Sequence, residues 1–254
     1  MCIRDSHLVY RPLMKRCDDI WFVSEQQAAL WARKMPFIKD KSLTIYNGID
    51  LSYFDPSGFD AAAVELRESL GISAADKVLC SVARFRPEKL HSVLIDAVAQ
   101  AREEGVNCHL LLAGGGPLEQ ELRDQVARLN LAASIHFLGT LADVRPVLVA
   151  ADCKMLVSAA ETFSMAMLEA MAMQTPVITT SVGGAGEAID DGVTGYLVKP
   201  GDPAVLAGTI KRALSDNDSL QHMGTAARQT VEERFSVEAM VAQSQQRLRE
   251  LAAS

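Results

Sequence analysis

Two acidic and two basic side chains are the residues in this sequence most suited to chemistry. Glu161 and Glu169 lie eight positions apart in one stretch, and Arg84 and Lys89 lie five positions apart in another. Carboxylates accept hydrogen bonds from hydroxyl groups, whereas guanidinium and ammonium groups bind phosphates. Together, the four side chains could hold a ligand that carries both hydroxyl groups and phosphate.

The stretch from Lys154 to Glu187 contains the elements that must position the two carboxylates. Its apolar run Met155–Val157 is typical of a buried parallel strand, and residues 164–173 have the pattern of a helix. Pro176 ends that helix and leads into a second apolar run, Val177–Thr180. This unit predicts an α/β fold with a Rossmann-like, doubly wound parallel sheet, in which ligands bind beyond the carboxyl ends of the strands.

The start of the predicted helix is a candidate anion site. A helix N-terminus offers unpaired backbone N–H groups and partial positive charge. The amides of Phe163, Ser164 and Met165 could face a phosphate, with Glu161 and Glu169 accepting hydrogen bonds on either side. A nucleotide sugar has this layout of ribose hydroxyls, diphosphate and sugar hydroxyls. The structural alternative for Glu169 is a carboxylate that the helix dipole stabilises near the N-terminus.

A basic loop is predicted at the same edge of the sheet. Lys77–Ala83 reads as a strong strand, and the loop after it contains Arg84 and Lys89, which could chelate a diphosphate. Alternatively, both are solvated loop cations, which is the usual role of such residues. We favour phosphate binding because this loop and Glu161 both follow strands of one parallel sheet.

The segment SAAETFSMAMLEAMAMQTPVITTSVGGAGE resembles the donor-site signature of retaining nucleotide-sugar glycosyltransferases of the two-domain GT-B type. The resemblance is to their group 1, glycogen-synthase-like family. It implies that Glu169 binds the ribose hydroxyls and that Glu161 faces the transferred sugar in a catalytic role. The amides of residues 163–165 would face the phosphates. Thr162 stands where the family often has Gly, and with Phe163 and Met165 it would shape the sugar pocket.

Other segments resemble the same family. Arg84 and Lys89 match a motif whose Arg and Lys hold the donor phosphates, with Ala83 and Leu90 where Gly is common. Further donor-binding positions implied by the resemblance lie in two loops, with backbone facing the base at Gly139, Thr140 and Leu141 and a GG-x2-E element at Gly183, Gly184 and Glu187. For Glu187, a helix-start carboxylate is an equal alternative.

The resemblance also divides the chain. The motif Asn47-Gly48-Ile49-Asp50 resembles the end of the family's acceptor-side domain. Residues 1–6 match neither a signal peptide nor a helix start, and they resemble a translated sequencing adapter. We expect a non-native leader at 1–6, a remnant of the N-terminal acceptor-side domain and linker at 7–50, a nucleotide-sugar-binding domain at 51–234 and a C-terminal crossover helix at 235–254. A small α/β lead-in is the alternative for residues 7–50.

The amino-acid composition limits the kinds of partner and the compartment that this chain is expected to have. The 254 residues carry a formal net charge of −7, which argues against an extended nucleic-acid surface. The five cysteines are scattered without metal spacing and favour the reducing cytoplasm. No apolar run approaches the roughly 20 residues of a membrane span, although peripheral contact with the inner face of a membrane stays compatible. No Asp-x-Asp pair lies near the site, as expected of a metal-independent enzyme without a cofactor.

These features predict the donor domain of a retaining hexosyltransferase. It would take a UDP-, GDP- or ADP-sugar and transfer the glycosyl group to a sugar, lipid or polysaccharide acceptor held by a missing N-terminal domain, so the fragment alone would be weakly active. The alternative is a non-catalytic nucleotide-sugar-binding subunit. A Rossmann dehydrogenase is disfavoured, because Gly114–Gly116 is followed by Pro117 and does not complete the G-x-G-x-x-G fingerprint.

Overall fold

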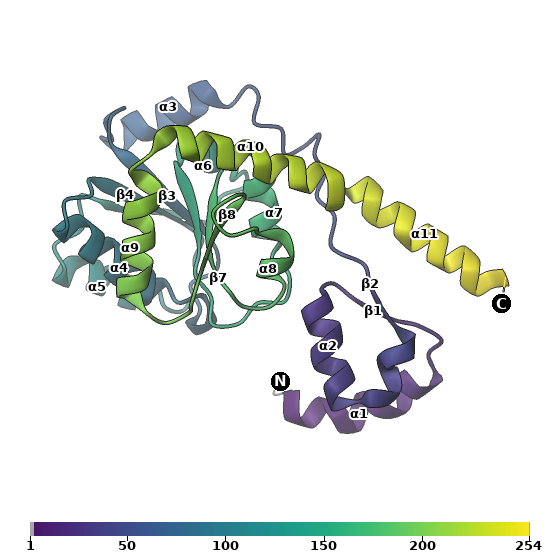
Figure 1. Ribbon diagram of the computed structural model, residues 1–254. Coiled ribbons are helices and arrows are strands. Elements are labelled where there is room, and N and C mark those ends of the chain that lie inside the picture. The colour runs from purple at the N-terminus through teal and green to yellow at the C-terminus, as the bar shows by residue number, and fades with distance from the viewer. Residues whose placement is uncertain (1–2, 254) are drawn as a thin grey trace.

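The computed structural model describes the backbone of residues 3–253 and the side chains of residues 10–253. The chain forms a larger lobe around a parallel sheet and a smaller lobe from its first residues, and the last helix extends from the larger lobe toward the smaller one (Figure 1). The α/β fold with a parallel sheet confirms the fold class predicted from the sequence, and this sheet positions the candidate site.

The larger lobe is built on a six-stranded parallel sheet in the order β5-β4-β3-β6-β7-β8. The strands are β3 (Lys77–Val82), β4 (Cys108–Ala113), β5 (Ile135–Gly139), β6 (Cys153–Leu156), β7 (Val177–Thr180) and β8 (Gly195–Val198). The strand order reverses between β3 and β6, which are neighbours in the sheet. This reversal is the topological switch point of a doubly wound fold, as the sequence predicted.

Helices cover both faces of this sheet, because alternate residues of each strand are apolar on both sides. Along β6, Cys153 and Met155 pack into one hydrophobic cluster and Leu156 into the other. The helices of the first layer are α4 (His91–Glu103), α5 (Glu119–Arg128) and α9 (Pro203–Leu214). Those of the second layer are α3 (Asp60–Ser69), α6 (Arg145–Ala150), α7 (Met165–Ala172) and α8 (Ala185–Ala188).

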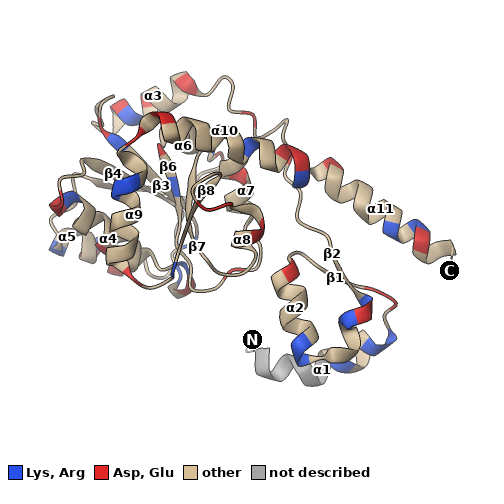
Figure 2. Ribbon diagram, in the orientation of Figure 1, with Lys and Arg blue, Asp and Glu red and all other residues tan. Residues whose placement is uncertain are grey.

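Two helix ends need comment. The last long helix of the lobe, α10 (Asn217–Arg234), begins against the first cluster at Leu220 and ends against the second at Val231. The helix α5 begins at Glu119 after the cap residue Leu118, two residues beyond Pro117. The charged residues of the six strands are Lys77 and Lys154, so the sheet is almost free of charge compared with the surface (Figure 2).

The smaller lobe has a small core of its own. Its elements are α1 (Ile3–Arg16), β1 (Ile20–Phe22), α2 (Glu25–Lys34), the 3-10 helix η1 (Pro36–Lys41) and β2 (Ser42–Thr44). The two strands pair in parallel, and Phe22, Met35 and Ile38 are its buried centre. The prediction that no helix starts in residues 1–6 was wrong for Ile3–Ser6, while Met1 and Cys2 lie outside the described residues.

The two lobes are joined where the chain crosses twice. Ile49 and Ser236 form a parallel bridge, in which Ile49 N donates to Phe235 O at 2.8 Å and Val237 N donates to Ile49 O at 3.0 Å. Beyond this crossing, α11 (Val237–Ala253) reaches the smaller lobe, where Arg247 pairs with Asp19. None of the helices in the described part of the chain combines the length and apolar character that a membrane span requires.

Candidate functional site

The loops that follow β3 and β6 meet at the carboxyl edge of the sheet. The first loop contains the 3-10 helix η2 (Pro87–Lys89), and the second runs over residues 157–164. Ala159 N donates a hydrogen bond to Glu88 O at 2.8 Å, which ties the loops together. The structure therefore brings the basic and acidic stretches of the sequence to one place, the switch point where doubly wound folds bind ligands.

An ion pair links the two loops. Lys89 Nζ lies 2.5 Å from Glu161 Oε2, and the two side chains are 23% and 22% exposed. One predicted phosphate-binding cation thus contacts one predicted catalytic carboxylate. Because both groups remain partly open to solvent, an anionic ligand could reach the ammonium group from outside.

The N-terminus of α7 forms the floor of the site. Ser164 is its N-cap, and its hydroxyl accepts a hydrogen bond from Met167 N at 3.3 Å. A narrow hollow beneath this end is lined by Ser158, Glu161 and Ser164, among others. The Ser158 hydroxyl is buried without a hydrogen-bond partner among the described residues. The unpartnered Ser158 hydroxyl and the backbone amides at the start of α7 suit an oxygen-rich ligand.

Phe163 does not shape a sugar pocket as predicted. Its ring is 5% exposed and packs against Tyr46 at 5.1 Å and Phe235 at 5.4 Å between ring centroids. Burial of this large ring is favourable, so it anchors the start of α7 in the core. Thr162 faces the cleft between the lobes, and Met165 is 37% exposed.

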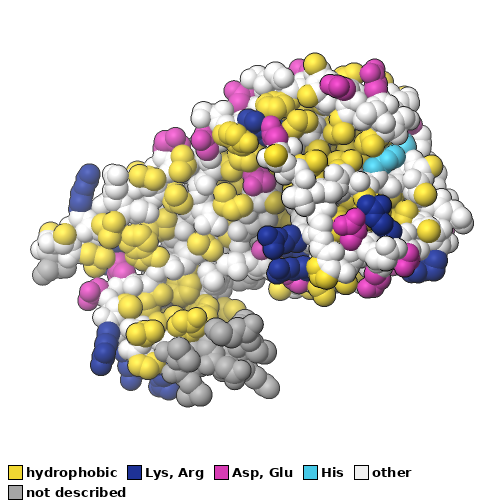
Figure 3. Space-filling model, turned by 180° about the vertical axis from the view of Figure 1, so that it is seen from behind, with side chains coloured by type: hydrophobic (Ala, Val, Ile, Leu, Met, Phe, Trp, Pro, Cys, Tyr) yellow, Lys and Arg dark blue, Asp and Glu magenta, His cyan; other side chains and the backbone are white. Residues whose placement is uncertain are grey.

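A cleft of about 780 Å³ separates the lobes beside the ion pair. Gln27, Trp31 and Arg33 of α2 line one wall, and Lys89 and Glu161 lie on the other with neighbouring residues. Seen from behind, Lys and Arg side chains gather on the rim of the larger lobe where it faces the smaller one (Figure 3). The cleft therefore offers space for a second molecule next to the predicted catalytic carboxylate.

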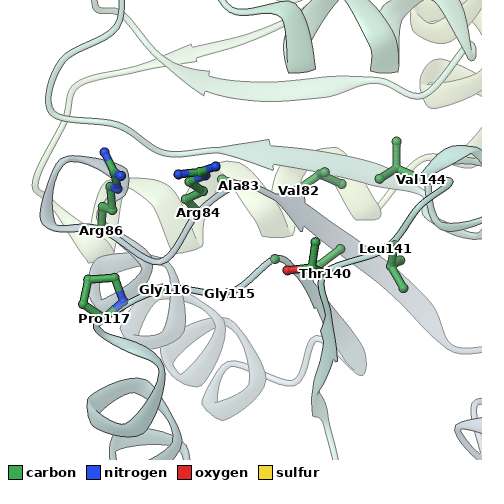
Figure 4. A pocket seen from close by; sticks show the side chains of 12 residues that line it. Val82, Ala83, Arg84, Arg86, Gly115, Gly116, Pro117, Thr140, Leu141 and Val144 are labelled. Atoms are coloured by element: carbon green, nitrogen blue, oxygen red, sulfur yellow. The ribbon is translucent and has the colours of Figure 1, made fainter.

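A second hollow, of about 380 Å³, opens on the other side of the β3 loop. Arg84 and Arg86 extend from that loop on one side, and Thr140 and Leu141 line the other (Figure 4). Gly139 does not line this hollow, but its carbonyl oxygen accepts a hydrogen bond from Gly114 N at 2.7 Å. Both arginines are exposed, so their guanidinium groups are available to a ligand.

Glycines let the loops around this hollow and beside the cleft pack closely. Gly114 has φ +145°, and a Cβ there would lie 2.0 Å from the Ala83 carbonyl oxygen. Gly183 has φ +55°, and a Cβ there would lie 2.1 Å from the carbonyl oxygen of Glu161. Gly184 N donates to Thr162 O at 2.7 Å. The two predicted donor-site glycines, Gly183 and Gly184, therefore shape the backbone on which Glu161 stands.

Glu187 has a role that neither sequence interpretation included. Its Oε2 accepts a hydrogen bond from Glu25 N at 2.8 Å, and its Oε1 accepts one from Gln26 N at 2.9 Å. It therefore caps α2 across the junction between the lobes. Burial, and then a hydrogen bond with Glu187, raise the pKa of the Tyr46 hydroxyl well above its usual range. Contact between Glu187 and a donor stays a prediction.

Glu169 lies half-buried on α7, and its side chain makes no hydrogen bond or ion pair within the described residues. It is not among the residues that line the two larger hollows, so its predicted contact with ribose stays a prediction. Its charge does act on a buried lysine, Lys154, in the strand below.

Sequence reasoning missed two polar residues of this edge and one inside the sheet. Arg86 accompanies Arg84 in the hollow, and Lys154 is buried in β6. His91 is 2% exposed, and neither ring nitrogen has a hydrogen-bond partner. Burial, and then the charge of Lys89, lower the pKa of His91 to about 4. A lysine inside the apolar run Cys153–Leu156 was the one sequence signal for such a buried group.

The described side chains contain no group of three or more His, Cys, Asp or Glu residues placed to hold a metal ion. The ligand chemistry of this edge, as far as residues 10–253 show it, consists of cations, backbone amides, hydroxyls and carboxylates. Such groups match the hydroxyl and phosphate groups that the sequence led us to expect.

Comparison with known proteins gives a consistent result. Residues 64–230 match the family described as Glycosyl transferases group 1. N-acetyl-alpha-D-glucosaminyl L-malate synthase of Bacillus anthracis is 35% identical over 200 residues, covering 79% of this chain and 51% of that protein. Human alpha-1,3/1,6-mannosyltransferase ALG2 is 31% identical over 217 residues, covering 76% and 52%. The chain thus spans about half the length of these curated relatives.

Solved structures agree in fold. Anabaena HepE in complex with UDP-glucose superposes with a TM-score of 0.87 at 27% identity, covering 100% of this chain and 69% of that one. The C-terminal domain of the group 1 glycosyl transferase LpcC from Francisella tularensis superposes with a TM-score of 0.66 at 23% identity, covering 75% of this chain and all of that domain. The second likeness shows the fold of the larger lobe.

Proposed function

The chain belongs to the group 1 glycosyl transferases, a retaining family, and we propose that its switch-point site binds a nucleoside-diphosphate sugar as glycosyl donor. The observation that carries this proposal is the meeting of the β3 and β6 loops, which joins Lys89 to Glu161 at the start of α7. The complexes of HepE with UDP and with UDP-glucose support a uridine nucleotide as the first donor to test.

The geometry supports a role for each wall of the site. The hollow beside Thr140 and Leu141 would take the base, and Glu169 would accept hydrogen bonds from the ribose hydroxyls. Arg84, Lys89 and the amides at the start of α7 would hold the diphosphate. Cations and helix-end amides are favourable partners for this group.

The same groups would promote the transfer. When the bond between the anomeric carbon and the diphosphate oxygen breaks, negative charge develops on the leaving diphosphate, which Arg84 and Lys89 would stabilise. An acceptor hydroxyl then forms the new bond to the anomeric carbon with retained configuration, and its proton leaves with the departing phosphate. Glu161 would contact the transferred sugar at the border of the cleft between the lobes.

We place the acceptor, a sugar, lipid or polysaccharide, in that cleft. Its second wall is α2 of the smaller lobe, which supplies Gln27, Trp31 and Arg33. Because relatives are about twice as long, an activity of the whole protein would involve further surface on that side. The scattered cysteines favour a cytoplasmic setting, where nucleotide sugars are available to the cleft.

Calorimetric titration of the chain with UDP, GDP and ADP tests the proposal, and Gly115→Leu supplies a variant that blocks the site. A Cβ at Gly115 makes only ordinary contact, 3.5 Å from Thr140 Oγ1, so the longer side chain would fill the hollow without backbone strain. Gly208→Leu is the matched control, because nothing lies within 4 Å of a Cβ there. We expect binding of one nucleotide, lost in the first variant and kept in the second.

Absence of binding by all three nucleotides at millimolar concentration would refute the proposal. If Gly115→Leu leaves the affinity for the nucleotide unchanged, the nucleotide binds outside this hollow. A labelled donor then separates the two functional classes. Transfer or slow hydrolysis of the glycosyl group supports the enzyme, whereas binding without either supports a non-catalytic nucleotide-sugar-binding subunit.

A further inference from the structure

Lys154 is a charged side chain sealed inside the larger lobe. It lies in β6, where its register partners are Cys80 of β3 and Val177 of β7, and it is 0% exposed. Its ammonium nitrogen has no hydrogen-bond partner within residues 10–253. No other charged residue of that stretch belongs to the buried class, so Lys154 differs in kind from the surface lysines.

This placement is costly for folding. An ammonium group moved from water into apolar surroundings without a partner loses far more free energy than its stem gains. The strand positions on either side, Cys80 and Val177, are apolar, and so is Leu156 on the same face of β6. A methionine of similar length would fill this space at lower cost. Stability alone therefore gives no reason for a lysine here.

The charges that act on Lys154 indicate a different reason. Burial lowers the pKa of its ammonium group, Cys80 and Glu169 oppose this effect, and Lys89 adds to it. Glu169 is the carboxylate in this set, and it projects from α7, which packs on the face of the sheet that Lys154 shares with Leu156. Lys89 already pairs with Glu161. Glu169 has no such surface partner, and its counter-charge lies below it.

We propose that Lys154 is a positioning residue, whose buried ammonium group attracts the Glu169 carboxylate from below and holds it where it meets the ribose hydroxyls of the donor. The inference rests on the proposed function, since it assigns Lys154 to the donor site through Glu169. Lys154 itself touches no ligand. Its effect is to limit the directions that the carboxylate can take, so that fewer side-chain states are lost when the nucleotide binds.

A double-mutant cycle tests this coupling. The variants are Lys154→Met, which keeps the length of the side chain and removes its charge, Glu169→Gln, and the two combined. Met155→Leu is the control, because Met155 is the next residue of β6, is equally buried and faces the opposite cluster. The probe is whichever of UDP, GDP and ADP binds the unsubstituted chain most tightly, measured by calorimetry alongside thermal unfolding.

We expect Lys154→Met to bind the nucleotide about tenfold more weakly, which is within the range of coupling energies between neighbouring residues. Its midpoint of thermal unfolding should stay the same or rise, because a buried charge has been removed. In the Glu169→Gln background, the same substitution should change affinity by less than about twofold. Met155→Leu should leave affinity unchanged.

Three results would overturn the inference. Unchanged affinity in Lys154→Met would show that the ammonium group does not act on the site. A large fall in the unfolding midpoint together with lost affinity would show a structural role instead. Fully additive effects of the two substitutions would show that Lys154 does not act through Glu169. If the unsubstituted chain binds none of the three nucleotides, the proposed function fails first, and the inference fails with it.

Discussion

The two ends of the central sheet differ in whether their polar side chains have partners within the protein. At the amino end, Arg67 Nη2 lies 3.1 Å from Asp152 Oδ2, and the same oxygen accepts a hydrogen bond from Val78 N at 2.7 Å. Also at this end, His109 Nδ1 and His136 Nε2 are 3.1 Å apart, in neighbouring strands. The polar groups there find their partners within the protein.

At the carboxyl end, the polar groups of the described chain are largely left to solvent or to a ligand. Arg84 and Arg86 are exposed, and the polar side-chain atoms of His91 and Ser158 have no partner. The ion pair between Lys89 and Glu161 is the exception, and it is open to the cleft.

This difference separates architecture from function. Buried polar groups are nearly always hydrogen-bonded, so a cluster of exceptions needs a specific cause. Here two of the exceptions, His91 and Ser158, lie at the edge where the fold class binds ligands. We infer that the amino end was shaped for stability and the carboxyl end for binding, and each substitution below should affect one end without the other.

The largest effect is expected at the amino end. Asp152→Ala removes the partner of Arg67 and of Val78 N, so the free energy of unfolding should fall by about 3 kcal/mol. Chemical denaturation measures this change. Glu104→Ala breaks the Lys211–Glu104 pair, whose side chains are each 53% exposed, and should cost less than about 1 kcal/mol. Equal losses in the two variants would contradict the distinction, as would altered nucleotide affinity in folded Asp152→Ala.

Acid should destabilise the carboxyl end through His91. Its pKa in the folded protein is about 4, below the ordinary value of 6.5, so the unfolded chain takes up a proton that the folded chain refuses. The free energy of unfolding therefore has its full His91 contribution above pH 6.5. It falls by up to about 3 kcal/mol between pH 6.5 and pH 4, and it levels off below pH 4. Denaturation at a series of pH values measures this slope.

His91→Leu should remove most of that pH dependence. The pKa values of His109 and His136 are also lowered, chiefly by burial, so part of a slope of the same sign should remain in the variant. If the stability of His91→Leu depends on pH as steeply as that of the unsubstituted chain, His109 and His136 at the amino end cause the pH dependence.

Arg84→Ala should weaken binding without weakening the fold. Losing one charged phosphate contact costs about 2 kcal/mol, or roughly thirtyfold in the dissociation constant of the nucleotide. The free energy of unfolding should change by less than about 0.5 kcal/mol, because the side chain is exposed and no ion pair of it is found in the described structure. Calorimetry and denaturation of Arg128→Ala, an exposed residue at the end of α5, provide the baseline.

Glu161→Gln should give the smallest change, and it should strengthen nucleotide binding. It releases Lys89 from a carboxylate and removes a negative charge from the phosphate site, so a nucleoside diphosphate should bind about threefold more tightly. Loss of a partly exposed pair should cost less than about 1 kcal/mol of stability. Weaker nucleotide binding would indicate that Glu161 itself contacts the nucleotide.

Much of the larger lobe could be predicted from local sequence. The apolar run Val177–Thr180 and the helical pattern of residues 164–173 fall where the structure has β7 and α7. Parallel strands must then present their following loops at one edge, so the meeting of the Arg84 and Glu161 loops followed from topology. Strong local patterns were sufficient for these features.

The remaining features depend on contacts between residues far apart in the chain. Glu187 caps a helix whose first residues are 161 and 162 positions away, and no local pattern indicates such a partner. His109 and His136 meet only because β4 and β5 are adjacent in a particular register. The burial of Phe163 depends on Tyr46 and Phe235, which come from the two polypeptide connections that cross between the lobes.

That crossing has a mechanical consequence. The lobes are joined by two polypeptide connections that are hydrogen-bonded to each other at Ile49, and a Cβ on Gly48 would lie 2.6 Å from Val237 Cα. Neither connection can slide past the other, whereas a tilt about this point leaves both hydrogen bonds in place. The hydrogen bonds from Glu25 N and Gln26 N to Glu187 lie away from this point, so a tilt that widens the space between the lobes would break them first.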